Sequence, residues 1–260
     1  MILRSAVLAV LAATAACGAP SVQSSPAAPA ITVAAASDLR VAFEELGEQL
    51  HAETGLEVTF SFGSSGQLRE QILNGAPFDV FASANVEFVD DVISAGCGDP
   101  ATKTDYAFGR LVLWTPPGGV APSTVADLAD PSYRRIAIAN PDHAPYGKAA
   151  EQALARAGVL DAVGGRLVFG ENIADTLRIA QSGNADVGLV ARSLTIGDGR
   201  DHALVPENLH DPLRQALVVT ATGDRRAPAR AFAAFVGSDA GRRIMARYGF
   251  ALPGEREDPR

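Results

Sequence analysis

Cysteine and histidine are scarce in this sequence, and basic residues are fewer than acidic ones. The 260 residues include 2 cysteines and 4 histidines, and 30 acidic against 22 basic residues give a formal net charge of -8. Nucleic-acid binding requires a basic face that displaces counterions, so we expect no nucleic-acid partner. An acidic surface also exerts no long-range attraction on an anion. Any anion site must therefore act through short-range hydrogen-bond donors.

The familiar catalytic and cofactor motifs are also missing. The turn SFGSSG lacks the Gly-Lys-Ser/Thr ending of a P-loop and the three spaced glycines of a dinucleotide fold. Neither Ser64 nor Ser65 has glycines two residues to either side, as a hydrolase elbow needs. The histidines show no metal spacing, and we expect surface or loop positions for His51, His143, His202 and His210. The sequence therefore predicts no cofactor, no ligands for a metal cation and no enzyme activity.

The first residues are typical of an export signal. One positive charge, an apolar run and small residues up to Cys17 form a segment too short to span a membrane. Residues 15–18, AACG, resemble the lipobox of bacterial lipoproteins, in which the cysteine is acylated after cleavage. We expect a signal peptide over 1–16, a lipid anchor at Cys17 and a flexible tether over 17–30, with Cys97 unpaired. A plain cleaved signal with a disordered start is the alternative.

From Ile31 onward, short apolar runs alternate with amphipathic segments. This rhythm predicts an α/β protein with helices around mostly parallel sheets, and no transmembrane segment follows the signal. The chain is 47% hydrophobic, enough for the core of one large domain or two modest ones. Helices are expected between the strands, and a long one over 227–248 closes the chain. The expected strands cover 31–36, 56–62, 79–84, 110–115, 136–141, 166–171, 186–191 and 216–221.

Two serine-containing turns each separate an expected strand from a helix, and neither contains lysine. They are AAASDLR, residues 34–40, and SFGSSGQLR, residues 61–69. The free N–H groups and the positive dipole end of a helix's first turn can hold an anion without any basic side chain. Helix capping is the simpler role for Ser37 or Ser65 alone. Two such turns in adjacent units favour an anion ligand.

Longer stretches around these turns resemble the molybdate-binding receptors of bacterial ABC importers. They are VAAASDL, FSFGSSGQLREQILNGAPFDVFASA, ANPDHAPYGKAAEQAL, SGNADVGLVA and GRRIMARYGF, within residues 31–250. The resemblance implies the two-lobed type II periplasmic-binding-protein fold. Each lobe would be a mixed, mostly parallel sheet flanked by helices, with the ligand cleft between the lobes. We place lobe 1 at 31–107 and 219–252, lobe 2 at 108–218 and a flexible tail at 253–260.

The resemblance also implies a set of oxyanion-binding residues from both lobes. Ser37 and Ser65 would donate through hydroxyl and backbone N–H groups, and Asp38 through its backbone N–H alone, with its carboxylate turned away. The second lobe would contribute Tyr146 and the backbone N–H of Ile173.

One position departs from many relatives. They carry alanine at the position of Tyr146 and tyrosine at that of Ala191, so we expect the phenol to have changed place in this chain. The Tyr146 hydroxyl would then point at the anion.

The predicted function is an exported, membrane-anchored lipoprotein that captures molybdate or tungstate and delivers it to the membrane permease of an ABC importer. We expect a monomer that touches the membrane only through its lipid. Donors without acceptors suit a fully deprotonated ion and disfavour a protonated phosphate. The alternatives are a receptor for another oxyanion, such as sulfate or phosphate, and an exported serine hydrolase using Ser65. The hydrolase has no histidine or aspartate in a sequence context that would activate the serine.

Overall fold

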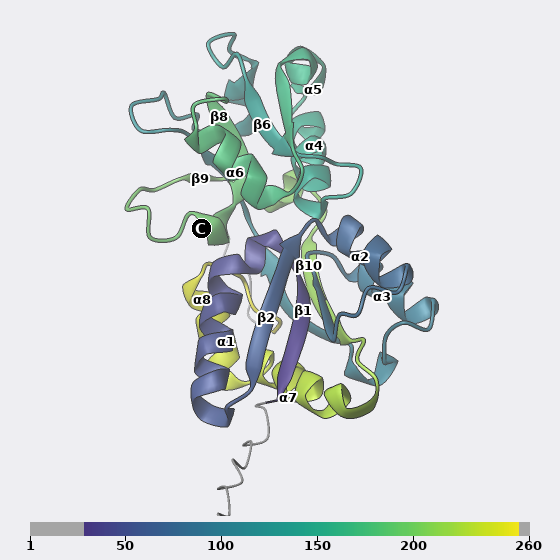
Figure 1. Cartoon of the computed structure of the whole chain (residues 1–260). Helices are drawn as coiled ribbons and strands as arrows, with labels where there is room; N and C mark the ends of the chain where they lie inside the picture. The colour runs from purple at the N-terminus through teal and green to yellow at the C-terminus, as the bar shows by residue number, and fades with distance from the viewer. Residues whose placement is uncertain (1–28, 255–260) are drawn as a thin grey trace, which may run out of the picture.

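The computed structural model describes residues 29–254 of the chain. The expected signal peptide, Cys17 and most of the expected tether lie outside these residues, and so does the tail after Gly254. The described part forms two lobes, each built on a five-stranded sheet, one above the other in Figure 1. The two-lobed α/β fold is thereby confirmed.

The first lobe contains the sheet β2-β1-β3-β10-β4. The parallel strands are β1 (Ala30–Ala36), β2 (Glu57–Gly63) and β3 (Val80–Ser83). The antiparallel pairings involve β10 (Leu213–Val219), which lies between β3 and β4 (Thr104–Gly109). The helices of this lobe are α1 (Arg40–Thr54), α2 (Ser65–Leu73), α3 (Val86–Ser94), α7 (Arg226–Val236) and α8 (Asp239–Arg247).

The second lobe repeats this mixture of parallel and antiparallel pairs in the order β7-β6-β8-β5-β9. Its parallel strands are β6 (Ile136–Ala139), β7 (Leu167–Gly170) and β8 (Val187–Ala191). The remaining strands, β5 (Leu111–Trp114) and β9 (Ala203–Leu204), complete the sheet through antiparallel pairs of β5 with β8 and β9. Its helices are α4 (Pro145–Arg156), α5 (Leu160–Val163) and α6 (Ile173–Gln181).

The chain passes between the sheets twice, after β4 and before β10. The first sheet resumes at Leu213, earlier than the expected lobe boundary at Val219. The apolar pattern of a strand's sequence does not reveal which sheet the strand joins, because the sheet is determined by the other strands with which it pairs. Within residues 29–254, no helix has the length and apolar content needed to cross a bilayer.

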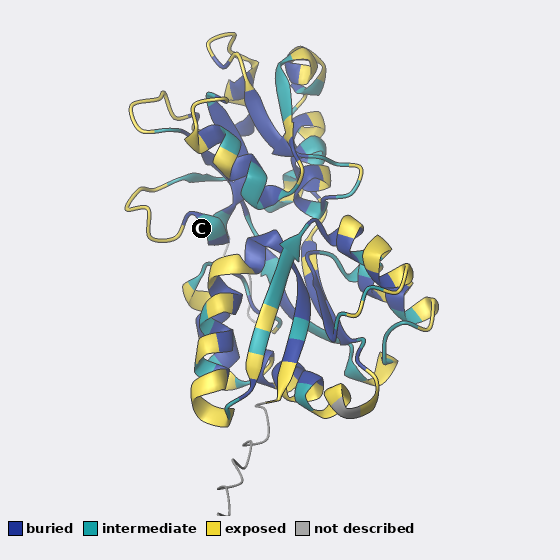
Figure 2. Ribbon diagram, viewed as in Figure 1, coloured by how far each residue is buried: buried dark blue, intermediate teal, exposed yellow. Residues whose placement is uncertain are grey.

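Apolar residues at helical spacing attach α1 to the first sheet. Phe43, Leu46 and Leu50 are all buried, and the ring of Phe43 lies 5.7 Å from that of Phe232 on α7. The helix expected over 227–248 is in fact two, because Ser238 starts α8 as its N-cap and accepts the Gly241 N–H at 3.2 Å. Figure 2 shows buried residues in the inner strands of the sheets and where the two lobes meet, whereas the edge strand β2 is intermediate or exposed.

Candidate functional site

The five residues expected to bind an oxyanion line one small cavity between the lobes. The ends of β1, β2 and β3 approach it from the first lobe, and the starts of α4 and α6 from the second. Its empty space is at most about 190 Å³, below the roughly 300 Å³ at which sites for drug-sized ligands begin. The cavity therefore suits an ion of a few atoms. Its lining comprises Ala36, Ser37, Asp38, Gly63, Ser64, Ser65, Ala84, Ala144, Pro145, Tyr146, Asn172 and Ile173.

Two serine hydroxyls in the cavity are held in place by backbone donors. Ser65 Oγ accepts the N–H of Ala84 at 3.0 Å, and Ser37 Oγ accepts the N–H of Ala174 at 3.3 Å. Both serines are buried, and the hydrogen of each hydroxyl has no acceptor among the described residues. Neither serine is an N-cap, since Ala36 precedes Ser37 and Ser64 precedes Ser65 in those positions. Two oriented O–H groups are therefore available to a ligand.

The first turns of two helices in the second lobe add backbone donors. Asn172 caps α6, and its Oδ1 accepts the N–H groups of Ala174 and Asp175 at 3.1 and 3.0 Å. This leaves the N–H of Ile173, which has no intrahelical acceptor because it opens the helix. In α4 the first residue is proline, so the first N–H belongs to Tyr146. Sequence analysis missed Asn172, although asparagine before a helical pattern is a recognisable N-cap signal.

The carboxylate of Asp38 is buried where the two lobes meet. Its Oδ2 accepts hydrogen bonds from the Tyr146 hydroxyl at 3.0 Å and from Gln215 Nε2 at 2.6 Å, whereas Oδ1 is buried without a partner. Burial raises the pKa of Asp38 to about 6, and the hydrogen bonds from Gln215 and Tyr146 oppose that rise. Asp38 therefore contributes more than a backbone N–H to the surroundings of the cavity.

Tyr146 lines the cavity, but its hydroxyl hydrogen is used elsewhere. The expectation was that this hydroxyl points at the anion, and the structure instead shows it donating to Asp38. The pKa of the Tyr146 phenol is raised well above its usual value, mainly by burial and next by the negative charge of Asp38. A Cβ at Gly109 would clash with the Tyr146 hydroxyl oxygen, so only glycine leaves room there. Ala191 ends β8 and is not part of the cavity lining.

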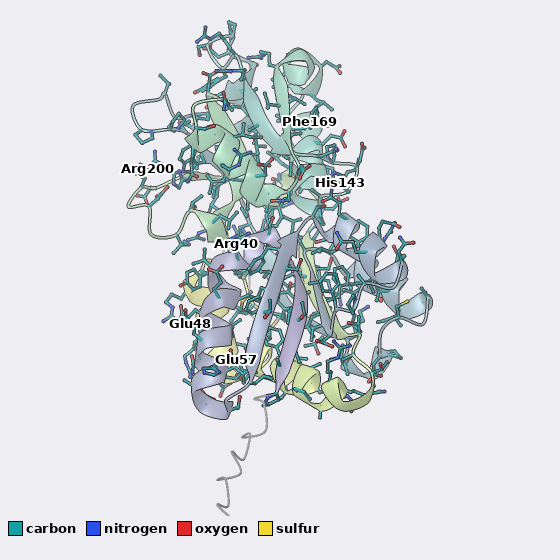
Figure 3. The ribbon with its side chains drawn as sticks, in the orientation of Figure 1. Arg40, Glu48, Glu57, His143, Phe169 and Arg200 are labelled. Carbon is teal, nitrogen blue, oxygen red and sulfur yellow. The ribbon has the colours of Figure 1, made fainter. Side chains whose placement is uncertain are left out.

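A direct contact between the lobes involves His143, which Figure 3 shows where they meet. Its carbonyl oxygen accepts the Ser64 hydroxyl at 2.5 Å and the Gly66 N–H at 3.0 Å. Its Nδ1 lies 2.8 Å from Ser64 Oγ. His143 and His210 both lie in loops as expected, although His210 is buried at 4% exposure.

The Ser64–His143 pair bears on the serine-hydrolase alternative. A serine and a histidine do meet here, which the sequence did not reveal. A nucleophilic serine gives its proton to the imidazole, however, and Ser64 donates its hydrogen to the His143 carbonyl. The contact joins the two lobes and does not have the arrangement of an activated nucleophile.

Comparison with known proteins gives consistent matches across both lobes. The family model of bacterial extracellular solute-binding proteins matches residues 31–251. The molybdate-binding protein ModA of Rhodobacter capsulatus is 35% identical over 228 residues, which cover 86% of this chain and 89% of that protein. ModA of Azotobacter vinelandii is 33% identical over 226 residues, covering 85% of this chain and 90% of that protein. The solved structure of the Azotobacter vinelandii periplasmic molybdate-binding protein has a TM-score of 0.80 at 32% identity, covering 86% of this chain and 99% of that one.

Proposed function

This chain belongs to the bacterial extracellular solute-binding proteins and, within them, to the ModA molybdate-binding proteins, and we propose that it captures molybdate and delivers it to an ABC importer. As a member of this family it is a solute-binding protein and not an enzyme. The site residues of the proposal are Ser37, Asp38, Ser65, Tyr146 and Ile173, which line the cavity between the lobes.

The pair of buried serine hydroxyls carries the proposal. Each has a backbone N–H on its oxygen and an unused hydrogen, so each is oriented to donate to an oxygen atom in the cavity. The N–H of Ile173 and the N–H of Tyr146 add donors at two helix N-termini, where the dipole favours negative charge. No lysine or arginine is among the lining residues. Neutral donors therefore offset the charge of the anion through short, charge-assisted hydrogen bonds.

The same geometry supports binding of tungstate, an oxyanion of the same shape and charge. A protonated phosphate is disfavoured because its O–H would meet another donor and leave both unpaired. Sulfate is fully deprotonated, so discrimination against it must come from the size of the cavity and not from its donors. The lipid anchor at Cys17, the monomeric state and the movement of the two lobes relative to each other, with the chain crossing after β4 and before β10, are further parts of the proposal.

Calorimetry tests this function and its donors together. Purified protein freed of bound oxyanion is titrated with molybdate, tungstate, sulfate and phosphate. We expect the first two to bind tightly, and tighter binding of sulfate or phosphate would contradict the proposal. Ser65→Ala should weaken molybdate binding by about 1 to 3 kcal/mol, because an anion oxygen loses its donor. Ser132→Ala, at an exposed serine of the second lobe, is the matched control and should leave the affinity unchanged.

A further inference from the structure

Asp38 is a buried acidic residue beside a cavity that we propose binds an anion. Asp38 is the one acidic residue in the lining, and it is 1% exposed. Its Oδ2 already accepts two hydrogen bonds, and its buried Oδ1 has no partner. A carboxylate in this position is held by donors on one oxygen only.

The groups that face Asp38 are neutral. They are Tyr146 from α4 and Gln215 from β10, with Tyr106 from β4 bonded in turn to Gln215 Oε1 at 3.1 Å. From the second lobe, the hydroxyl of Ser193 donates to the Asp38 backbone carbonyl at 2.7 Å. None of the ion pairs in the described part of the chain involves Asp38. The pKa of Tyr106 and that of Tyr146 are both raised, first by burial and then by the negative charge of Asp38.

A bound dianion and an ionised Asp38 would repel each other, because both border one small cavity whose lining includes no basic residue. Building on the proposed function, we propose that binding of the oxyanion takes up one proton, which Asp38 carries on Oδ1. Oδ1 is the oxygen that can take the hydrogen, since both hydrogen bonds to the carboxylate fall on Oδ2. The anion then meets a neutral carboxylic acid, and Oδ2 keeps its two donors.

The direction of the pH dependence follows from the two protonation states. The pKa of Asp38 is about 6 in the protein without a ligand, and a neighbouring dianion raises it further. Below about pH 6 the acid is protonated before and after binding, so Asp38 causes no change of affinity with pH in this range. Above pH 6, and up to the pKa in the complex, each binding event takes up a proton. The affinity then falls by up to tenfold for each unit of rising pH.

Calorimetry in buffers of different ionisation enthalpy measures the proton directly. The full chain without its signal is titrated with molybdate at pH 7.5 in three buffers, and the slope of binding enthalpy against buffer enthalpy gives the protons taken up. We expect the wild type to take up close to one proton for each molybdate bound. Asp38→Asn should bind molybdate with almost no proton uptake, because an amide places N–H₂ where the acid would carry its hydrogen. Asp90→Asn, at an exposed aspartate paired with Lys103, removes the same charge and should keep the uptake of the wild type.

Three outcomes would overturn this inference. Molybdate binding by the wild type without any buffer dependence would leave the proposed function intact and remove the proton. A proton still taken up by Asp38→Asn would place it on the anion or another group. Absence of molybdate binding by the wild type would overturn the proposed function and this inference together. The wild-type series decides by itself if Asp38→Asn does not fold.

Discussion

The hydroxyl of Tyr146 has a single hydrogen, and the carboxylate of Asp38 accepts it at 3.0 Å. The acceptor comes from the first lobe and the donor from the second, so this bond also joins the lobes. Without it, Gln215 would be the one remaining side-chain donor to the buried Asp38 carboxylate. Tyr146 therefore acts on the carboxylate beside the anion, while its backbone N–H remains available to the anion itself.

Removing this hydroxyl separates two roles of Tyr146. We expect Tyr146→Phe to lower the free energy of unfolding by about 1 to 3 kcal/mol, because a buried carboxylate loses a hydrogen bond. Molybdate affinity should fall less in Tyr146→Phe than in Ser65→Ala, because the hydroxyl hydrogen of Ser65 is unused in the structure and is available to the anion. Urea unfolding and calorimetry measure the two quantities. Unchanged stability with a large loss of affinity would show that the phenol donates to the anion directly.

Residues near the cavity differ in how far the sequence could predict them. Ser37 and Ser65 come just after strands and open helices, a local pattern that is visible in a single sequence. Gln215 approaches Asp38 from 177 positions away, and no spacing rule connects them. The residues next to Gln215 in the sequence form no recognisable motif. Only the pairing of β10 with β3 and β4 brings Gln215 to the site.

At the scale of elements, the start of α2 fits closely against the loop that leads into α4. The Gly66 N–H donates to the His143 carbonyl at 3.0 Å, and a Cβ at Gly66 would lie 2.7 Å from that oxygen. This distance is shorter than real Cβ contacts, and the His143 carbonyl oxygen is a backbone atom that cannot rotate away. The glycine thus permits the two lobes to meet here.

A methyl group at Gly66 should separate binding from folding. Alanine favours a helix by about 1 kcal/mol over glycine, so Gly66→Ala should not destabilise α2 within its own lobe. It should push the loop containing His143 away and weaken molybdate binding at least tenfold, because donors from both lobes are needed. Calorimetry and thermal unfolding test this. Gly164→Ala, where an added Cβ meets nothing within 4 Å, is the control, and equal affinities in the two variants would contradict the expected role.

The elements themselves were predicted to different extents. Strands such as β1 and β6 are short apolar runs, and all the residues of β6 are buried, so their patterns identify them. The sequence did not indicate β4 or α3, and it merged α7 with α8. The apolar spacing continues across the break between those helices, and the turn is held by Ser238, whose hydroxyl donates to the Phe235 carbonyl and accepts the Gly241 N–H.

At the scale of the whole molecule, the two ends of the first lobe face different surroundings. The carboxyl ends of β1 and β2 reach the cavity, whereas β1 begins at the opposite end of its lobe, far from the second lobe in Figure 1. A tether that joins the chain before β1 therefore leaves the cavity free. An anchored receptor with this geometry can close around its anion without involving the anchor.

This arrangement makes the anchor separable from binding. Replacing Cys17 with serine should move the protein from the membrane fraction to the soluble one, because an acylated cysteine supplies the hydrophobic attachment. Molybdate affinity should be unchanged, since the cavity is lined only by residues from 36 onward. Fractionation of cells that express each form, with the mass of the mature N-terminus, measures the difference. Equal fractionation of the two forms, with an unmodified N-terminus, would instead indicate a plain cleaved signal and a receptor that diffuses freely to its permease.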